Sequence, residues 1–163
     1  MRILITADSW PPEISGTATH VPFVADGLTR QGHSVRVLVG TSDPSVTLAE
    51  HARGFVVEGL DTSRRTVRQT FRLFTHLRWA DAVYDNGLLG WFNDLNWWLR
   101  KPIVARVNRD SLWEYAVQHG WTTDGFDTFQ RRRYGRVIEH VRHQRRQALA
   151  KTRAVIVPCA YLQ

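Results

Sequence analysis

Cysteine is almost missing from this sequence, because Cys159 is the only one among 163 residues. An intramolecular disulfide is therefore excluded, and a reducing compartment is the expected location. No apolar run approaches the ~20 residues that a membrane-spanning helix needs. No signal-peptide pattern opens the chain, since the apolar run at residues 3–5 begins at once. These absences predict a cytoplasmic protein.

Acidic residues are outnumbered, with 15 Asp and Glu against 22 Lys and Arg, so the formal net charge is +7. The isoelectric point is about 10.5. This surplus favours anionic partners, namely polyanions, phosphorylated substrates or anionic membrane surfaces. The hydrophobic fraction of 43% is that of a globular protein, and the length predicts a single domain over 1–163.

Several motifs are also missing. No G-x-G-x-x-G fingerprint and no P-loop lysine occurs, which argues against the common dinucleotide and P-loop sites. The histidines are scattered without a nucleophile signature, so a Ser-His-Asp triad is not predicted. His140 and His143 have a spacing known from metal ligands, but histidines spaced in this way are more often solvated on a helix. We therefore predict no metal and no cofactor.

Short apolar runs alternate with helical patterns along the chain. The runs predict strands near residues 3–5, 34–40, 54–59, 82–84, 102–107 and 154–157. The helical periods predict helices near 17–30, 64–79 and 88–99, from Ser111 onward, and over 124–150. This alternation predicts an α/β fold with an open, doubly wound, Rossmann-like and mainly parallel sheet that has helices on both faces.

The patterns also assign individual positions. Thr17 or Thr19 is predicted to cap the first helix, in which Pro22 is tolerable only within about the first turn. Gly32 fits the left-handed position that ends this helix. The aromatic pair Trp97 and Trp98 is predicted to serve the core. The predicted buried positions of the helices 64–79 and 124–150 are Val67, Phe71 and Phe74, and Tyr134, Val137, Ile138, Val141 and Leu149, respectively.

Polar segments follow three of the predicted strands, at residues 15–16, 85–87 and 108–110. The carboxyl ends of parallel strands meet at one edge of a sheet, so these segments should converge on one crevice. The first segment also precedes a helix, whose free N–H groups and dipole favour a phosphate or carboxylate. An ordinary strand–helix turn is the alternative for this segment.

Six motifs occur in an order that resembles one enzyme family. Trp10-Pro-Pro-Glu-Ile-Ser-Gly16 is similar to an aromatic-Pro-Pro-x-x-Gly-Gly loop, and Gly32-His-Ser-Val35 to a Gly-His-x-Val strand entry. Tyr84-Asp-Asn-Gly87 is similar to a Tyr-x-Asn-Gly strand end, and Arg109-Asp-Ser-Leu-Trp-Glu114 to a Gly-Asp-x-x-Trp-Glu motif. Phe129-Gln130 and Val155-Ile-Val-Pro-Cys-Ala-Tyr-Leu162 complete the set. The whole chain thereby resembles the N-terminal half of a GT-B fold glycosyltransferase of family GT4.

The resemblance implies a retaining transfer of a sugar from a nucleotide-sugar donor, which is a substrate, to a sugar or lipid-linked acceptor. In that family this half holds the acceptor, and a C-terminal half holds most donor contacts. That second half is expected in the same chain or as a separate subunit, and this chain alone is predicted to have no turnover. The implied substrate-binding residues are Ser15, Gly16, Thr17, Asn86, Gly87, Asn108, Arg109, Asp110, Trp113 and Glu114, with Asp110 as the best catalytic candidate.

Several of these residues have two interpretations. Trp113 either stacks on a sugar face or, together with Glu114, belongs to a helix that packs on the sheet with a salt bridge. Ser15 replaces the first glycine of the family's pair, and Asn108 stands where many relatives have a histidine. Arg109 replaces a motif glycine, and it either binds a phosphate through two N–H groups or fills the cleft of an inactive member.

Two functions from other classes stay open. The helix predicted over 124–150 carries Arg131, Arg132, Arg133, Arg136, Arg142, Arg145 and Arg146 on its outer face. These arginines would bind a polyanion or dock the protein on the inner face of an anionic membrane, or they would form a solvated face without a partner. Nucleic acid is not the expected polyanion, because the sequence has no RNA- or DNA-binding motif. Alternatively, the chain is a non-catalytic module that pairs with a separate second half through its cleft.

Overall fold

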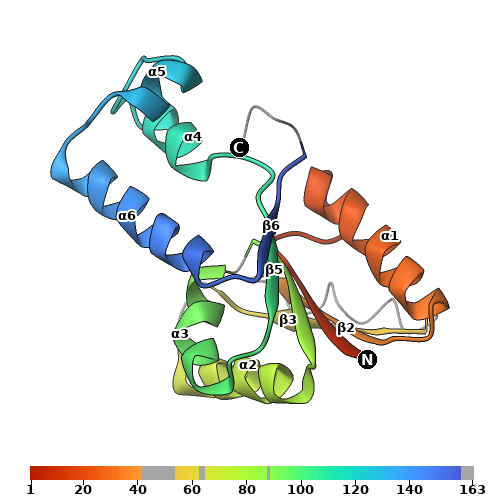
Figure 1. The fold of residues 1–163 in the computed structure, drawn as a ribbon. Helices are drawn as coiled ribbons and strands as arrows, with labels where there is room; N and C mark the ends of the chain where they lie inside the picture. Colours follow the sequence, from red (N-terminus) through yellow and green to blue (C-terminus); the bar gives the residue numbers. More distant parts are fainter. Residues whose placement is uncertain (42–53, 63–64, 88, 159–163) are drawn as a thin grey trace.

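A computed structural model describes residues 1–41, 54–62, 65–87 and 89–158. Most of the stretch between the strands predicted at 34–40 and 54–59 lies outside these residues, and so do Leu88 and Cys159. The described strands form a parallel sheet in the order β3-β2-β1-β4-β5-β6. They are β1 (Arg2–Ala7), β2 (Ser34–Gly40), β3 (Val56–Leu60), β4 (Ala82–Asn86), β5 (Ile103–Arg106) and β6 (Ala154–Ile156). The predicted α/β fold is confirmed (Figure 1).

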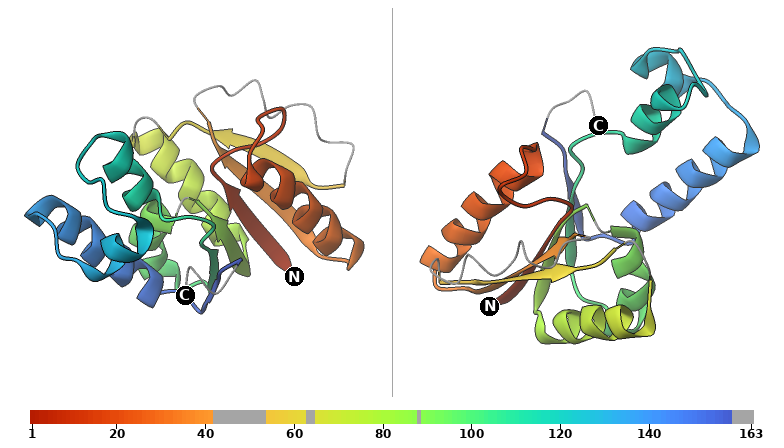
Figure 2. Two further views of the ribbon diagram at one scale, coloured as in Figure 1. Left: turned by 90° about the horizontal axis from the view of Figure 1, so that it is seen from above. Right: turned by 180° about the vertical axis from the view of Figure 1, so that it is seen from behind.

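Helices cover both faces of this sheet, as expected for parallel strands joined by crossovers. The view from behind in Figure 2 shows α1 (Gly16–Arg30) on one face, and α2 (Val67–Trp79) and α3 (Leu89–Leu99) on the other. Val21 and Ala25 of α1 pack on Ile5 and Val37 of the sheet. The strand order reverses between β1 and β4, so the connections leave the sheet in opposite directions there and open a crevice at the carboxyl edge.

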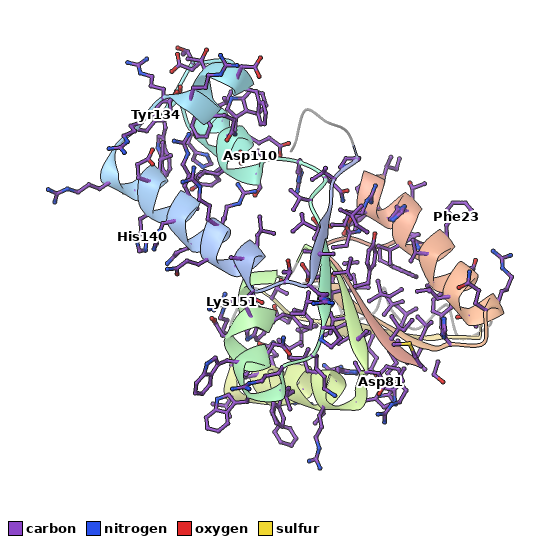
Figure 3. All side chains as sticks on the ribbon, viewed as in Figure 1. Phe23, Asp81, Asp110, Tyr134, His140 and Lys151 are labelled. Carbon is purple, nitrogen blue, oxygen red and sulfur yellow. The ribbon has the colours of Figure 1, made fainter. Side chains whose placement is uncertain are left out.

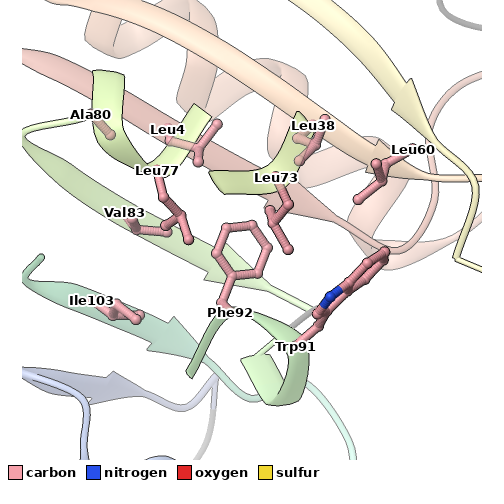
Figure 4. Packing of buried hydrophobic residues seen from close by; sticks show 10 residues of the cluster. All are labelled: Leu4, Leu38, Leu60, Leu73, Leu77, Ala80, Val83, Trp91, Phe92 and Ile103. Atoms are coloured by element: carbon pink, nitrogen blue, oxygen red, sulfur yellow. The ribbon is translucent and has the colours of Figure 1, made fainter. Parts of the chain in front are cut away.

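The second core cluster lies between the sheet, α2 and α3. Leu73 and Leu77 of α2 and Phe92 of α3 are fully buried against Leu4 and Leu38 of the sheet (Figure 4). Burial of a Leu or Phe side chain stabilises the fold by about 1.5–3 kcal/mol. These contacts therefore fix which sides of α2 and α3 face the sheet.

The predicted core faces of α2 and α3 are partly wrong. Val67 is 88% exposed and Phe71 is 66% exposed, because the competing stripe of Leu73 and Leu77 occupies the core. Trp97 and Trp98 are 69% and 78% exposed, and their rings meet edge to face on the surface of α3. An exposed aromatic ring costs a helix little, so the sequence pattern alone could not place these residues.

The start of α1 also differs from the prediction. Ser15 is the N-cap, and its Oγ accepts a hydrogen bond from the Ala18 amide at 2.9 Å, so neither Thr17 nor Thr19 caps the helix. Pro22 lies beyond the first turn and the helix continues through it to Arg30. Gly32 has a φ of 84°, as predicted for the residue that ends this segment.

The single helix predicted over 124–150 is two helices, α5 (Phe126–Arg131) and α6 (Arg136–Ala150). The backbone is extended at Arg132 and again at Gly135, which is the N-cap of α6. The ring of Tyr134 turns back to lie 4.8 Å from that of Phe129. Together with α4 (Ser111–Gln118) these helices form a third small cluster beyond the carboxyl edge of the sheet (Figure 1).

This break changes which residues of α6 are buried. Ile138 is buried and Val141 is partly buried, as predicted, but Val137 is 63% exposed. The last turn of α6 packs back against α3, where Asn93 Nδ2 donates to the Ala148 carbonyl at 2.9 Å. The helix therefore spans from the third cluster to the sheet and passes over the strand ends.

Candidate functional site

A cleft of about 930 Å³ lies at the carboxyl edge of the sheet, where the strand order reverses. Its floor comes from the residues that follow β1, β4 and β5, and α1 and α6 supply its sides. Of the predicted binding residues, those that line it are Ser15, Gly16, Thr17, Asn86, Gly87, Asn108 and Arg109. The polar strand ends thus meet in one crevice, although they come from distant parts of the sequence.

The first wall is the N-terminus of α1. Ser15 Oγ also lies 2.5 Å from Ser9 Oγ, so the capping side chain is held by the segment that follows β1. Helix geometry leaves the first amides, those of Gly16 and Thr17, without an intrahelical acceptor. A Cβ on Gly16 would meet nothing within 4 Å, so the helix end faces open space. This arrangement favours an anionic or hydroxyl group of a ligand.

The floor is a hydrogen-bonded group of side chains from neighbouring strands. Asn108 Nδ2 donates to Asn86 Oδ1 at 2.8 Å, and the Asn86 amide donates to Thr6 Oγ1 at 3.3 Å. Thr6 Oγ1 in turn donates to Asp85 Oδ1 at 2.6 Å. Within the described part of the chain, Asn86 Nδ2 and Asn108 Oδ1 are buried without a partner. The floor therefore keeps one amide donor and one amide acceptor for a ligand.

Gly87 brings the end of β4 against the end of β1. Its φ is 132°, a conformation that side chains rarely adopt, and a Cβ there would lie 2.8 Å from Asp8 Cβ. Asp8 Oδ2 is 3.8 Å from Arg109 Nη2, and Arg109 Nη1 is 3.5 Å from Glu114 Oε2. Arg109 is therefore held across the cleft edge by two carboxylates.

Asp110 lies outside the cleft lining, at the start of α4 (Figure 3). Its Oδ1 caps the helix by accepting from the amides of Leu112 and Trp113, and Arg145 Nη1 lies 2.5 Å from the same oxygen. Its Oδ2 accepts from Gln130 Nε2 at 2.6 Å. Burial alone would raise the pKa of this carboxyl, but the hydrogen bond and charge of Arg145 outweigh it, so the pKa lies below its usual value. Asp110 is thus an anion that joins α4, α5 and α6.

Trp113 and Glu114 also lie outside the cleft lining. The Trp113 indole N–H donates to the Asp124 carbonyl at 3.1 Å, and its ring meets Phe126 edge to face. These contacts place Trp113 between α4 and α5 instead of on the sheet.

The sequence interpretation missed charged residues of the cleft, among them Asp8, Arg106 and Arg145. Asp8 follows β1 directly, and Arg106 is an arginine inside an otherwise apolar strand, so both had a local signal. Arg145 was assigned to an exposed helix face, and only the path of α6 over the strand ends brings it to the cleft. Arg142 was also predicted to lie on the exposed helix face. Its guanidinium instead lies 4.4 Å from the Phe129 ring centre, and its Nη1 donates a hydrogen bond to Glu139 Oε1.

In the described ranges, no three side chains among His, Cys, Asp and Glu gather as a metal site would require. In the same ranges, none of the helices combines the length and apolar character needed to cross a bilayer.

The fold is similar to that of solved structures of longer proteins. UGT2 of Phytolacca americana in its apo form matches with a TM-score of 0.54 at 11% identity, over 96% of this chain and 45% of that chain. UGT2 complexed with UDP-2fluoro-glucose and pterostilbene matches with a TM-score of 0.54 at 10% identity, over 96% and 46%. The chain thus spans about half the length of these structures, and its fold is similar to part of theirs. Neither a protein-family model nor a curated protein matches the sequence.

Proposed function

We propose that this chain is the acceptor-side half of a glycosyltransferase that takes a sugar from a nucleotide-sugar donor. The observation that carries the proposal is the cleft of about 930 Å³ at the strand ends, in a fold that matches 45% of UGT2. On this proposal a second half, in the same chain or in a separate subunit, covers the open side of the cleft and binds most of the donor. The isolated chain then binds acceptor without turnover.

Membership of family GT4 and retention of the anomeric configuration are finer parts of the same proposal. They rest on the six sequence motifs. The cleft supports a common role for these motifs, because Ser15, Asn86 and Arg109 belong to separate motifs and line the same space.

The proposal gives each cleft element a task. The free amides at the start of α1 and the unpaired amide groups of Asn86 and Asn108 bind polar groups of the substrates, since they offer both donors and acceptors. Asp110 does not face this space, so its proposed role is positioning: it holds Arg145, and with it α6, at the edge of the cleft.

The first experiment tests transfer. The coding sequence is read past Gln163, and the two-half protein, or this chain mixed with a separate second half, is incubated with UDP- and GDP-sugars. We expect release of nucleoside diphosphate that depends on an added sugar acceptor, and an NMR spectrum of the product showing the donor's anomeric configuration. No consumption of any nucleotide sugar would overturn the proposal, and an inverted product would overturn only the retaining, GT4 part.

Variants then tie the activity to the cleft. Asn86→Ala and Asn108→Ala should each lower kcat/KM for the acceptor by about tenfold or more, because each removes a buried hydrogen-bonding amide. Trp98→Ser is the matched control, since this side chain is 78% exposed on the far face of α3. Equal kcat/KM values in all three variants would contradict the placement of the acceptor in this cleft.

A second candidate function is docking on an anionic membrane, peripheral to its inner face. The observation that favours it is a group of exposed arginines on α5, on α6 and between them, namely Arg131, Arg133, Arg136 and Arg146. Each basic residue near an anionic surface contributes about 1 kcal/mol. Such a dock would bring a lipid-linked acceptor to the cleft.

Vesicle sedimentation tests this candidate. Binding to vesicles with phosphatidylserine but not to neutral vesicles supports it, and Arg133→Glu with Arg136→Glu should abolish the binding. Arg68→Glu with Arg78→Glu on α2 is the matched control for net charge. Retention on nucleic acid at physiological salt, with no vesicle binding, would overturn the dock.

A further inference from the structure

Arg106 is the last residue of β5, and it lines the cleft beside α1. Tyr84 of β4 pairs with Val104 of β5, and side chains two residues apart share a face of the sheet. Arg106 therefore lies on the same face as Tyr84 and Asn86. This is the face that α1 covers, since Tyr84 packs with the α1 cluster and its hydroxyl lies 3.1 Å from His20 Nε2 of α1.

Arg106 differs from the other arginines of the cleft. Arg109 faces Asp8 and Glu114, and Arg145 faces Asp110. The side chain of Arg106 has no ion pair or hydrogen bond to any residue that the structure describes, and its Nη1 is buried. A cation withdrawn from water without a counter-charge is unfavourable, so an anion in this part of the cleft would stabilise the protein.

The groups around Arg106 are donors or are neutral. Gly16 and Thr17 at the start of α1 line the cleft, and Asn86, which is 2% exposed, has an unpaired Nδ2. Exchanging O and N in both amides of the Asn86–Asn108 pair still leaves one N–H donor on the floor. Burial, and next the charge of Arg106, lower the pKa of His20, so its imidazole is neutral at pH 7.

The acidic residues of the cleft do not neutralise Arg106. Asp8 lies next to Arg109, and Asp85 points to the opposite face of β4, where it accepts from Thr6. Glu13 is exposed to solvent. The wall between β5 and the start of α1 therefore combines an uncompensated cation, a buried amide donor and a helix N-terminus.

We propose that Arg106, with Asn86 and the first turn of α1, binds an oxyanion, either a phosphate or a carboxylate, carried by the ligand of this cleft. The inference rests on the proposed function where it takes that ligand to be a glycosyl-transfer substrate. It makes Arg106 a residue that selects an anionic substrate over its uncharged analogue.

The test is NMR titration of the isotopically labelled chain with glucose 6-phosphate, glucose, UDP and inorganic phosphate in separate arms. We expect glucose 6-phosphate to bind at least about tenfold more tightly than glucose, with shifts at the Gly16 and Thr17 amides. Tight binding of UDP instead would assign the oxyanion to the donor, and tight binding of the sugar phosphate would assign it to the acceptor. The inference fails if none of glucose 6-phosphate, UDP and inorganic phosphate binds more tightly than glucose.

Matched arginine variants identify the residue. Arg106→Gln should weaken the best-binding arm by about tenfold or more, Arg106→Lys should retain part of the affinity, and Arg109→Gln should change it by less than about threefold. Loss of affinity in Arg109→Gln with none in Arg106→Gln would overturn the assignment. If Arg106→Gln fails to fold, the comparison of Arg106→Lys with Arg109→Gln decides.

His20 provides a readout that a purely structural role of Arg106 would not move. A bound oxyanion offsets the charge of Arg106, so the pKa of His20 should rise on titration with the ligand. An unchanged His20 pKa at saturation would contradict binding at Arg106. These measurements need no turnover, so phosphate binding without sugar transfer would refute only the proposed function. If the Arg106→Gln variant transferred sugar to uncharged acceptors with full activity, only this inference would be refuted.

Discussion

Arg145 Nη1 lies 2.5 Å from Asp110 Oδ1, which joins the middle of α6 to the N-terminus of α4. The Arg145 side chain is 33% exposed and that of Asp110 is 16% exposed, so water screens the pair only partly. This contact holds α6 over the strand ends and thereby shapes one side of the cleft. A residue predicted to be catalytic and a residue predicted to face solvent are thus partners in one structural link.

Asp110→Ala should destabilise the protein by about 1–3 kcal/mol, because it removes the cap of α4 and leaves Arg145 without its partner. Asp110→Asn should lower the free energy of unfolding by less, since the amide oxygen of the asparagine still caps the helix. The control is Asp127→Asn, an exposed carboxylate in the first turn of α5. Urea unfolding at pH 7 measures the three variants. Equal stability of Asp110→Ala and the control would contradict the link.

The lowered pKa of the Asp110 carboxyl predicts that the free energy of unfolding depends on pH. Its pKa is lower in the folded protein than in the unfolded chain, so it stabilises the fold above the unfolded pKa of about 3.8 and loses this effect as the pH falls through the lower folded value. Between pH 5 and pH 2 the wild type should lose more stability than Asp110→Asn. Parallel pH profiles of the two proteins, measured by urea unfolding, would show that the pKa of Asp110 is not lowered.

Gly87→Ala should be strongly destabilising, because the new Cβ would lie 2.8 Å from Asp8 Cβ at a φ of 132°. Unfavourable φ alone costs about 1–2 kcal/mol, and the contact adds to it. Gly90→Ala is the matched control: this glycine is helical, and a Cβ there would meet nothing within 4 Å. It should leave stability unchanged or raise it by up to about 1 kcal/mol. Thermal unfolding of both variants checks the pair, and equal Tm values would contradict the close approach of β4 to β1.

The tryptophans give a similar contrast. Trp10 is buried and meets Phe55 edge to face, so Trp10→Ala should destabilise the fold by about 3–5 kcal/mol. Trp98→Ala should change stability by less than about 0.5 kcal/mol, because its side chain is 78% exposed. Denaturant unfolding followed by circular dichroism measures both. A large effect of Trp98→Ala would mean that the α3 surface is covered.

The sheet and its ligand edge were predictable from sequence because their signals are local. Buried parallel strands read as apolar runs, as in β1 and β2, and the polar residues after each run then fall at one edge. This logic gathered Ser15, Asn86 and Arg109 into one crevice before the structure placed them there.

The remaining features depend on packing between distant segments. The pattern of α2 offered two apolar stripes of similar spacing, and only contact with Leu4 and Leu38 selects Leu73 and Leu77. The break before α6 follows from an extended backbone at Gly135 and from the return of the Tyr134 ring to Phe129. A continuous helical period across 124–150 contains neither piece of information, so Arg145 could not be assigned to the cleft from sequence.

The buried histidine His76 should also make the stability of the protein depend on pH, through a neutral imidazole that burial protects from protonation instead of through a carboxylate. His76 is a residue of α2 that is 6% exposed, and its Nε2 lies 3.3 Å from Oε2 of Glu58 in β3. Burial lowers its pKa, the charge of Glu58 partly opposes this, and Arg36 and Arg72 lower it further. As the pH falls below about 6.5, the unfolded chain therefore binds a proton that the folded protein does not, and the free energy of unfolding decreases.

His76→Gln should remove this dependence, so that its stability changes less between pH 7 and pH 5 than that of the wild type. One proton contributes at most about 1.4 kcal/mol per pH unit, which sets the largest difference in slope. His143→Gln is the control, because His143 is exposed on α6 and makes the same change of residue type away from the core. Urea unfolding at intervals of half a pH unit measures the slopes. The free energies of unfolding of His76→Gln and wild type could instead fall in parallel with pH, while that of His143→Gln does not. His76 would then not be the source of the acid sensitivity, and its placement against Glu58 would be wrong.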